Sequence, residues 1–240
     1  MGGLWFFAMV ALAAGLAGYE FFEMMAAGGH KLSLPFGLAL IFLFLLEARH
    51  PLELWGKFFL TAIIVGSLIW HLSWPGQTPA LDWALTLAGG LYIGWLSAHF
   101  ISLREMPNGG WWAIFAFALA WLGDAGAYFA GHLWGKHRLF PRLSPGKTWE
   151  GAIAGAFCTL VAAFLFGHFV RIGLLHRALL GLAVAALSPF GDLAVSMFKR
   201  QVKVKDSGGL IPGHGGMLDR IDSVLFSVVV VYYYRLFVLE

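Results

Sequence analysis

Long apolar segments separated by short polar loops constrain this chain more than any other feature of its sequence. A helix needs about 20 apolar residues to cross hydrocarbon, and only a helix or a closed barrel satisfies its backbone hydrogen bonds there. No barrel-like alternation of polar and apolar residues is visible. We therefore predict an all-α integral membrane protein, a polytopic bundle of about eight transmembrane helices within a range of seven to nine. The apolar segments are 4–26, 34–46, 57–73, 81–100, 111–131, 149–170, 176–195 and 222–239.

Composition supports this fold and excludes several classes of protein. Charged residues make up 12% of the chain, about half the roughly 25% found in soluble domains. The single cysteine, Cys158, excludes an intramolecular disulfide and a multi-cysteine zinc site. No soluble basic domain is present, so we expect no nucleic-acid partner. No basic region precedes the first apolar run, so we expect no cleavable signal peptide.

Loop charges predict the orientation. Nine of the sixteen Lys and Arg residues lie in the loops at 132–148 and 196–221. Cytoplasmic loops carry an excess of these residues, so both loops are expected to face the cytoplasm, in a multi-pass protein of the cell (inner) membrane. We treat 1–240 as one transmembrane domain, with 1–110 as a lipid-facing scaffold and 111–240 as the catalytic half. A polar cavity should open on the cytoplasmic side.

The most polar stretch runs from Ser196 to Asp222 and reads SMFKRQVKVKDSGGLIPGHGGMLDRID. Its basic residues can neutralise phosphates, and its five glycines let the backbone approach a ligand closely. Asp219 and Asp222 lie three residues apart, on one face of the helix that follows. Carboxylates together with substrate phosphates are the usual ligands of Mg²⁺. A loop that only sets topology accounts for the Lys and Arg residues, but not for the glycines or the Asp pair.

Three blocks of sequence resemble the phosphatidate cytidylyltransferases (CDP-diacylglycerol synthases). The long block matches as Ser196-x-Phe-Lys-Arg, Lys205-Asp and His214-Gly-Gly-Met-x-Asp-Arg-Ile-Asp, and Gly191-Asp192 begins this region. A second block is Ser144-Pro-x-Lys-Thr-x-Glu-Gly, and the third is the helix segment before it. The resemblance covers about 121–222. It implies transfer of a cytidylyl group from CTP to phosphatidate in the bilayer, giving CDP-diacylglycerol and pyrophosphate in phospholipid biosynthesis, by a homodimer.

Asp124 is the most informative residue of the fifth apolar segment. Asp124, Tyr128 and His132 follow each other at intervals of four, so they share one helix face. Asp124 should lie about 10 Å inside the cytoplasmic end of the helix. A carboxylate at that depth costs about 2.5–3.5 kcal/mol and normally faces a cavity. The alternative is a structural Asp paired with a neighbouring helix.

The following loop and the end of the seventh segment supply further polar groups. Lys147 is a point charge for a phosphate, and Ser144 and Thr148 are hydrogen-bond donors. Thr148 is equally suited to cap the sixth helix, with Glu150 in its first turn. Pro189 and Gly191 should kink or break the seventh helix. Ser188, Asp192 and Ser196 would then share a face near the basic cluster.

The resemblance and these patterns together assign roles. Asp192 and Asp219 are the first choice for holding Mg²⁺, with Asp222 behind or beside them, and a second, monovalent cation is compatible with the family. Asp124 would close the cavity, and His214 would donate to the departing pyrophosphate. The phosphates of CTP and phosphatidate would contact Lys147, Ser144, Thr148, Ser196, Lys199, Arg200, Lys203, Lys205, Gly215, Gly216 and Arg220.

Two other functions remain open from the sequence. Intramembrane Asp residues and broken helices also suit a transporter, although no inverted repeat is visible. A CTP-dependent enzyme acting on another lipid phosphate or a polyprenol would need the same polar residues. In the first half, Glu20 and Glu23 at the end of the first helix are interpreted as an interfacial, solvated pair. The polar residues His71, Asp82 and His99 are interpreted as interfacial.

Overall fold

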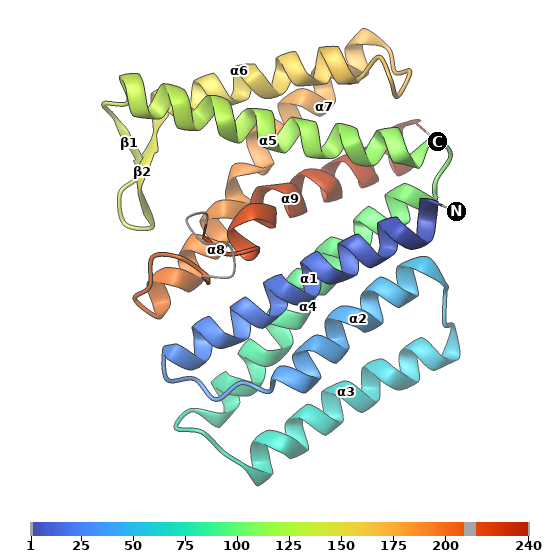
Figure 1. The fold of residues 1–240 in the computed structure, drawn as a ribbon, viewed down its shortest axis with the longest axis vertical. Coiled ribbons are helices and arrows are strands. Elements are labelled where there is room, and N and C mark those ends of the chain that lie inside the picture. The colour runs from blue at the N-terminus through green and yellow to red at the C-terminus, as the bar shows by residue number, and fades with distance from the viewer. Residues whose placement is uncertain (1, 209–214, 240) are drawn as a thin grey trace. The chain divides into compact units, whose positions relative to one another are not determined.

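The computed structural model describes residues 2–208 and 215–239, which are almost entirely helical (Figure 1). One short antiparallel hairpin joins two of the helices. The elements are α1 (Gly2–Ala27), α2 (Leu34–Arg49), α3 (Leu54–Ser73), α4 (Pro79–Glu105), α5 (Gly109–Trp134), β1 (Arg138–Phe140), β2 (Ser144–Thr148), α6 (Trp149–Phe166), α7 (Leu174–Leu187), α8 (Pro189–Gln201), α9 (Leu218–Tyr234) and a π-helical turn, Arg235–Leu239.

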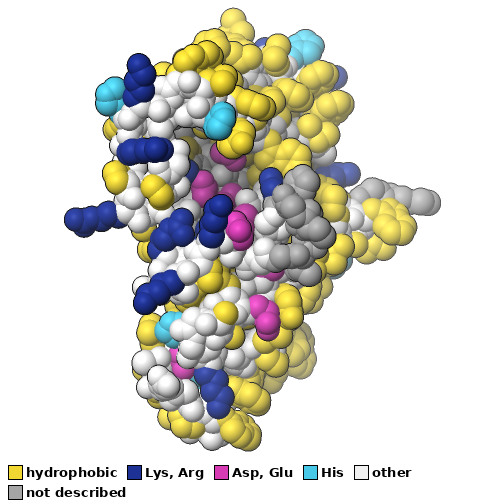
Figure 2. Space-filling model, turned by 60° about the vertical axis from the view of Figure 1, so that its left-hand side comes forward, with side chains coloured by type: hydrophobic (Ala, Val, Ile, Leu, Met, Phe, Trp, Pro, Cys, Tyr) yellow, Lys and Arg dark blue, Asp and Glu magenta, His cyan; other side chains and the backbone are white. Residues whose placement is uncertain are grey.

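Seven helical segments within the described residues are long and apolar enough to cross a membrane, and one of them, Leu174–Gln201, includes both α7 and α8. This confirms the prediction of an all-α polytopic membrane protein. The segment predicted at 34–46 is α2, whose 16 residues leave it outside those seven. Hydrophobic side chains cover a large part of the face shown in Figure 2. Over the described residues, Trp5, Trp55 and Phe157 are among the large apolar side chains that are exposed. Such a surface is stable against lipid chains rather than water.

The predicted break before Asp192 is confirmed. Helix α7 ends at Leu187, Ser188 is its C-cap, and α8 begins with Pro189. Proline tolerates the first turn of a helix because its missing N–H has no intrahelical partner there, whereas inside a helix it removes a hydrogen bond. Asp192 therefore lies in the first turn of a new helix.

The chain divides into two compact units, and α8 and α9 each run from one into the other. One unit contains Met1–Glu105 and Phe198–Arg220, and the other contains Met106–Met197 and Ile221–Glu240. The assignment of 111–240 to a catalytic half stays a prediction. Most of the polar stretch Ser196–Asp222 nevertheless lies in the unit that contains the N-terminal helices.

In the first unit, α1, α2 and α4 pack against one another, and α3 packs on α2 and α4 (Figure 1). The location of His71, Asp82 and His99 at the membrane interface stays a prediction, and their side chains are buried in the protein, with exposed fractions of 2%, 1% and 5%. The Asp82 carboxylate accepts hydrogen bonds from His30 Nδ1 at 3.2 Å and Thr78 Oγ1 at 3.1 Å. Helix packing buries these groups, and local hydrogen bonds offset their desolvation.

In the second unit, α5 and α6 approach each other closely at glycine residues. A Cβ at Gly123 would collide with the Thr159 hydroxyl, and one at Gly126 would lie 2.5 Å from Cys158 Sγ. On the facing helix, a Cβ at Gly155 would lie 2.9 Å from both the Gly123 carbonyl oxygen and an Ala127 methyl group. Small residues thus let the two backbones pack closely, as in many membrane helix pairs.

We expect Gly155→Val to destabilise the protein, because its side chain would have to push α5 away. Overpacking of this kind typically costs about 1–3 kcal/mol, and the contacted Gly123 carbonyl cannot rotate aside. The matched control is Gly146→Ala in the hairpin, where an added Cβ meets no atom within 4 Å. Thermal unfolding in detergent should show a lower midpoint for Gly155→Val alone. Equal midpoints for both variants would contradict the packing described here.

Candidate active site

The loop after α5 forms a two-stranded hairpin that the sequence analysis did not predict. Strands β1 and β2 pair antiparallel, with Arg138 opposite Thr148 and Phe140 opposite Ser144. Thr148 is buried, and its Oγ1 accepts a hydrogen bond from the Gly151 N–H at 3.1 Å. This confirms the predicted N-cap of α6, and the hydroxyl hydrogen is still available to donate to a phosphate.

Lys147, at the end of the same strand, contacts a carboxylate. Its Nζ lies 2.7 Å from Asp192 Oδ2 and donates to the Pro189 carbonyl oxygen at 3.1 Å. Ser196 Oγ donates to the other Asp192 oxygen at 3.3 Å, one turn along α8. The hairpin and the start of α8 therefore bring Lys147 and Asp192 together. The sequence analysis predicts that Lys147 contacts a phosphate and that Asp192 binds a metal ion.

Asp124 and Asp222 belong to the same unit and share one partner. Ser223 hydrogen-bonds to the Asp124 carboxylate, which also interacts electrostatically with Asp192 and Lys147. Asp222 is buried, and its Oδ1 accepts from the Ser223 N–H at 2.6 Å. Asp124 is itself exposed at the surface of the chain. The second unit thus gathers predicted site residues from α5, β2, α8 and α9.

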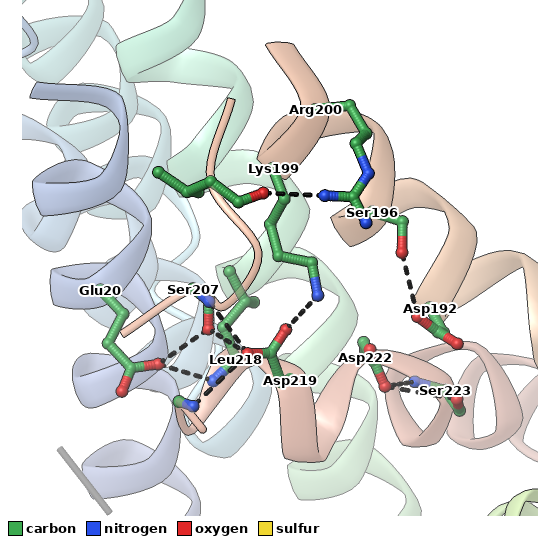
Figure 3. A network of polar contacts seen from close by, with 12 residues as sticks. Glu20, Asp192, Ser196, Lys199, Arg200, Ser207, Leu218, Asp219, Asp222 and Ser223 are labelled. Carbon is green, nitrogen blue, oxygen red and sulfur yellow. Dashed lines mark hydrogen bonds and ion pairs between the residues drawn. The ribbon is translucent and has the colours of Figure 1, made fainter. Parts of the chain in front are cut away.

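Asp219 is the centre of a separate cluster in the first unit (Figure 3). Lys199 Nζ lies 2.6 Å from its Oδ1. Its Oδ2 accepts from the Ser207 N–H at 3.0 Å and the Ser207 hydroxyl at 2.9 Å, and more weakly from the Gly216 N–H at 3.4 Å. The structure therefore directs Gly216 N–H towards a carboxylate, where the sequence predicted a phosphate contact.

Glu20 also belongs to this cluster, and its interpretation as a solvated residue is wrong. Its side chain is 2% exposed. Oε2 accepts from the Leu218 N–H at 2.9 Å and lies 3.4 Å from Ser207 Oγ. The signal in the sequence was a carboxylate within a long apolar helix, which normally faces a polar environment rather than lipid. Glu23, one turn further, is exposed.

The remaining basic residues lie on the outside of the first unit. Arg200 Nη1 donates to the Val204 carbonyl oxygen at 3.0 Å. Lys203 has φ of 59° in the turn that ends α8, and Lys205 is exposed beyond it. Arg220 is exposed in the first turn of α9. Gly215 has φ of 75°, a conformation that favours glycine. His214 lies outside the described residues.

The carboxylates suit a hard cation. Among residues 2–208 and 215–239, no three His, Cys, Asp or Glu side chains lie close enough together to hold a metal ion by themselves. Mg²⁺ needs no such cage, since it is usually bound by one or two carboxylates with water and substrate phosphates. Asp192 and Asp219 offer such oxygens from different units, so a metal shared between them stays a prediction.

Comparison with known proteins identifies the family. The sequence profile of the Cytidylyltransferase family matches residues 1–238. A phosphatidate cytidylyltransferase of Synechocystis is 34% identical over 98% of this chain and 89% of its own length. Those of Haemophilus influenzae and Staphylococcus aureus are 48% and 42% identical over 52% and 61% of this chain. The matched region spans 46% and 56% of those two relatives, about half of their length. The chain therefore belongs to the Cytidylyltransferase family.

Proposed function

We propose that this protein transfers the cytidylyl group of CTP to phosphatidate, giving CDP-diacylglycerol and pyrophosphate, as a step in phospholipid biosynthesis. The observation that carries the proposal is the match to the Synechocystis phosphatidate cytidylyltransferase, which extends over 98% of this chain. The transporter alternative has no comparable support. A different lipid phosphate as acceptor remains a variant of the same chemistry.

The proposed reaction suits a site built from lysines and carboxylates. A phosphatidate oxygen attacks the α-phosphorus of CTP, a new P–O bond forms, and the bond to pyrophosphate breaks. The attacking oxygen is already anionic at neutral pH, so no strong general base is needed. The main obstacles are repulsion between two polyanions and the charge that grows on pyrophosphate. Fixed positive charge and positioning therefore supply most of the catalysis.

We propose Mg²⁺ as the cofactor, held by Asp192 and Asp219 with Asp222 behind or beside them. When bound, the ion would neutralise phosphate oxygens as a Lewis acid. In this structure Lys147 and Lys199 each lie against one of these two carboxylates. The same ammonium groups are suited to bind the phosphates once a divalent cation holds the carboxylates. A second, monovalent cation is part of the proposal.

The other predicted roles also remain proposals. Asp124 would orient groups in the cavity, His214 would donate to pyrophosphate, and the exposed basic residues would attract the two anionic substrates. We further propose that the site faces the cytoplasm, where CTP is dissolved, and that the protein is a homodimer. The excess of Lys and Arg in the loops at 132–148 and 196–221 supports this orientation.

The test uses purified protein in detergent with labelled CTP, phosphatidate and Mg²⁺. We expect labelled CDP-diacylglycerol and an equal amount of pyrophosphate, with activity lost in EDTA and restored by added Mg²⁺. Replacing phosphatidate by a polyprenyl phosphate should abolish product. Absence of any CDP-lipid would overturn the proposed function, while undiminished activity after exhaustive EDTA treatment would overturn the metal alone.

A further inference from the structure

Helix α1 carries a buried carboxylate that the proposed reaction does not explain. Glu20 is buried, and Phe21 beside it packs edge-to-face on Phe198 at a centroid distance of 5.1 Å. Burying an ionisable group without partners is costly, so its contacts should reveal its purpose. The carboxylate points towards the segment that carries Asp219 (Figure 3).

The contacts of Glu20 fall on the start of α9. The Leu218 N–H is among the first N–H groups of that helix, which have no partner within the helix, and it donates to Glu20 Oε2 at 2.9 Å. An acceptor at this position is known to stabilise a helix when it is a local cap. Here the acceptor comes from another helix, 198 residues earlier in the chain.

The same carboxylate is linked to Asp219 through one hydroxyl. Ser207 Oγ lies 3.4 Å from Glu20 Oε2 and 2.9 Å from Asp219 Oδ2. A hydroxyl has a single hydrogen to donate, and the shorter distance favours Asp219 as its acceptor. Glu20 therefore borders both the residue before Asp219 and the side chain that hydrogen-bonds to it.

Two glycines enclose Glu20 tightly. A Cβ at Gly208 would lie 2.9 Å from Glu20 Oε1, and one at Gly216 would collide with Glu20 Oε2 and the Ser207 hydroxyl. Part of the glycine content that the sequence analysis assigned to phosphate binding thus makes room for this side chain. Glu20 Oε1 has no hydrogen-bond partner within residues 2–208 and 215–239. The hydrogen bond from Leu218 to Oε2 is therefore the best-defined function of the carboxylate.

We infer that Glu20 is a positioning residue for Asp219, acting by fixing the N-terminus of α9 against α1 through the Leu218 N–H. The inference rests on the proposed function, in which Asp219 holds a metal. Partners that orient a metal-binding carboxylate typically contribute about 10- to 100-fold to metal affinity or activity. The hydrogen bond to Leu218 depends on the length of the Glu20 side chain rather than on its charge.

Two substitutions separate the effect of side-chain length from the effect of charge at Glu20. Glu20→Gln keeps the length of the side chain and an oxygen that can accept from Leu218, but it removes the charge. Glu20→Asp keeps the charge, but it is one methylene too short to hold the same hydrogen bond. We expect Glu20→Asp to raise the Mg²⁺ concentration needed for half-maximal activity by about 10- to 100-fold, and Glu20→Gln to remain within about tenfold of wild type. Glu23→Asp, at an exposed site one turn away, is the matched control.

Hydrogen exchange of the substrate-free protein provides a readout that is independent of activity. The amide of Leu218 should exchange faster in Glu20→Asp than in wild type, and at the wild-type rate in Glu20→Gln and Glu23→Asp. The inference is overturned if Glu20→Asp shows wild-type exchange and Mg²⁺ dependence, or if Glu20→Gln is the more damaged variant. An inactive wild-type protein would overturn the proposed function instead, and the exchange rates would still test the contact.

Discussion

Asp192→Asn and Asp219→Asn should each lower cytidylyl transfer by at least about 10²-fold, a loss typical of removing one electrostatic contact to a transition state. Each substitution removes a charge that the other carboxylate cannot supply from its own position, and leaves Lys147 or Lys199 without its acid. Groups that act as one unit are non-additive. The double variant should therefore be little slower than either single variant in the labelled-CTP assay.

Asp206→Asn is the matched control for this experiment. Asp206 is an exposed carboxylate on the same polar stretch, so its replacement tests whether loss of any negative charge near the basic cluster is damaging. We expect near-normal turnover. If Asp219→Asn kept near-normal turnover and Mg²⁺ dependence, the shared metal would be wrong. Asp219 would then be only a partner of Lys199 and of the first turn of α9.

Among glycine-to-alanine substitutions in the second unit, we expect Gly191→Ala to lower stability and turnover the most. An added Cβ would collide with the backbone carbonyl of Asp222, so relief requires movement of α8 or α9 rather than of a side chain. Overpacking typically costs about 1–3 kcal/mol. Because Asp192 follows directly, we expect a fall in turnover as well as a lower unfolding midpoint in detergent.

Ala194→Gly offers a control on the same helix, since it removes a methyl group and adds none. It should lower stability only by about 1 kcal/mol, the usual helix-propensity cost, while the site keeps its geometry and its turnover. A Gly191→Ala protein with wild-type stability and activity would show that α8 and α9 are not held as closely as described.

Features encoded by neighbouring residues could be predicted from the sequence. The Thr148 cap and the break before Pro189 depend on a few adjacent residues, and both are confirmed. The helical segments were predicted from hydropathy, because lipid leaves a backbone few alternatives. The short hairpin was missed, since Ser144-Pro-Gly-Lys-Thr148 lacks the alternation that marks a strand.

Contacts between distant helices could not be predicted in the same way. Helix α1 is apolar around most of its circumference, so its periodicity does not reveal which side is buried. Glu20 consequently resembled a carboxylate at a membrane interface. The same reasoning did not reveal that Asp82 is buried against His30, which lies 52 residues away in the sequence. The candidate site residues from Asp124 to Asp222 were predicted from their depth and spacing and from the resemblance to a known family, whereas Glu20 lies outside the resembling blocks.

Residues 198–220 lie in the same unit as α1, and this affects how the chain folds while it is being synthesised. Glu20 enters the membrane long before Leu218 is synthesised, and at about 5–20 residues per second the delay over 198 residues is roughly 10–40 s. Throughout that interval a carboxylate within an apolar helix lacks its eventual donor, at a cost in lipid of a few kcal/mol. The first four helices can insert during translation, but α1 can complete its packing only after the start of α9 has arrived.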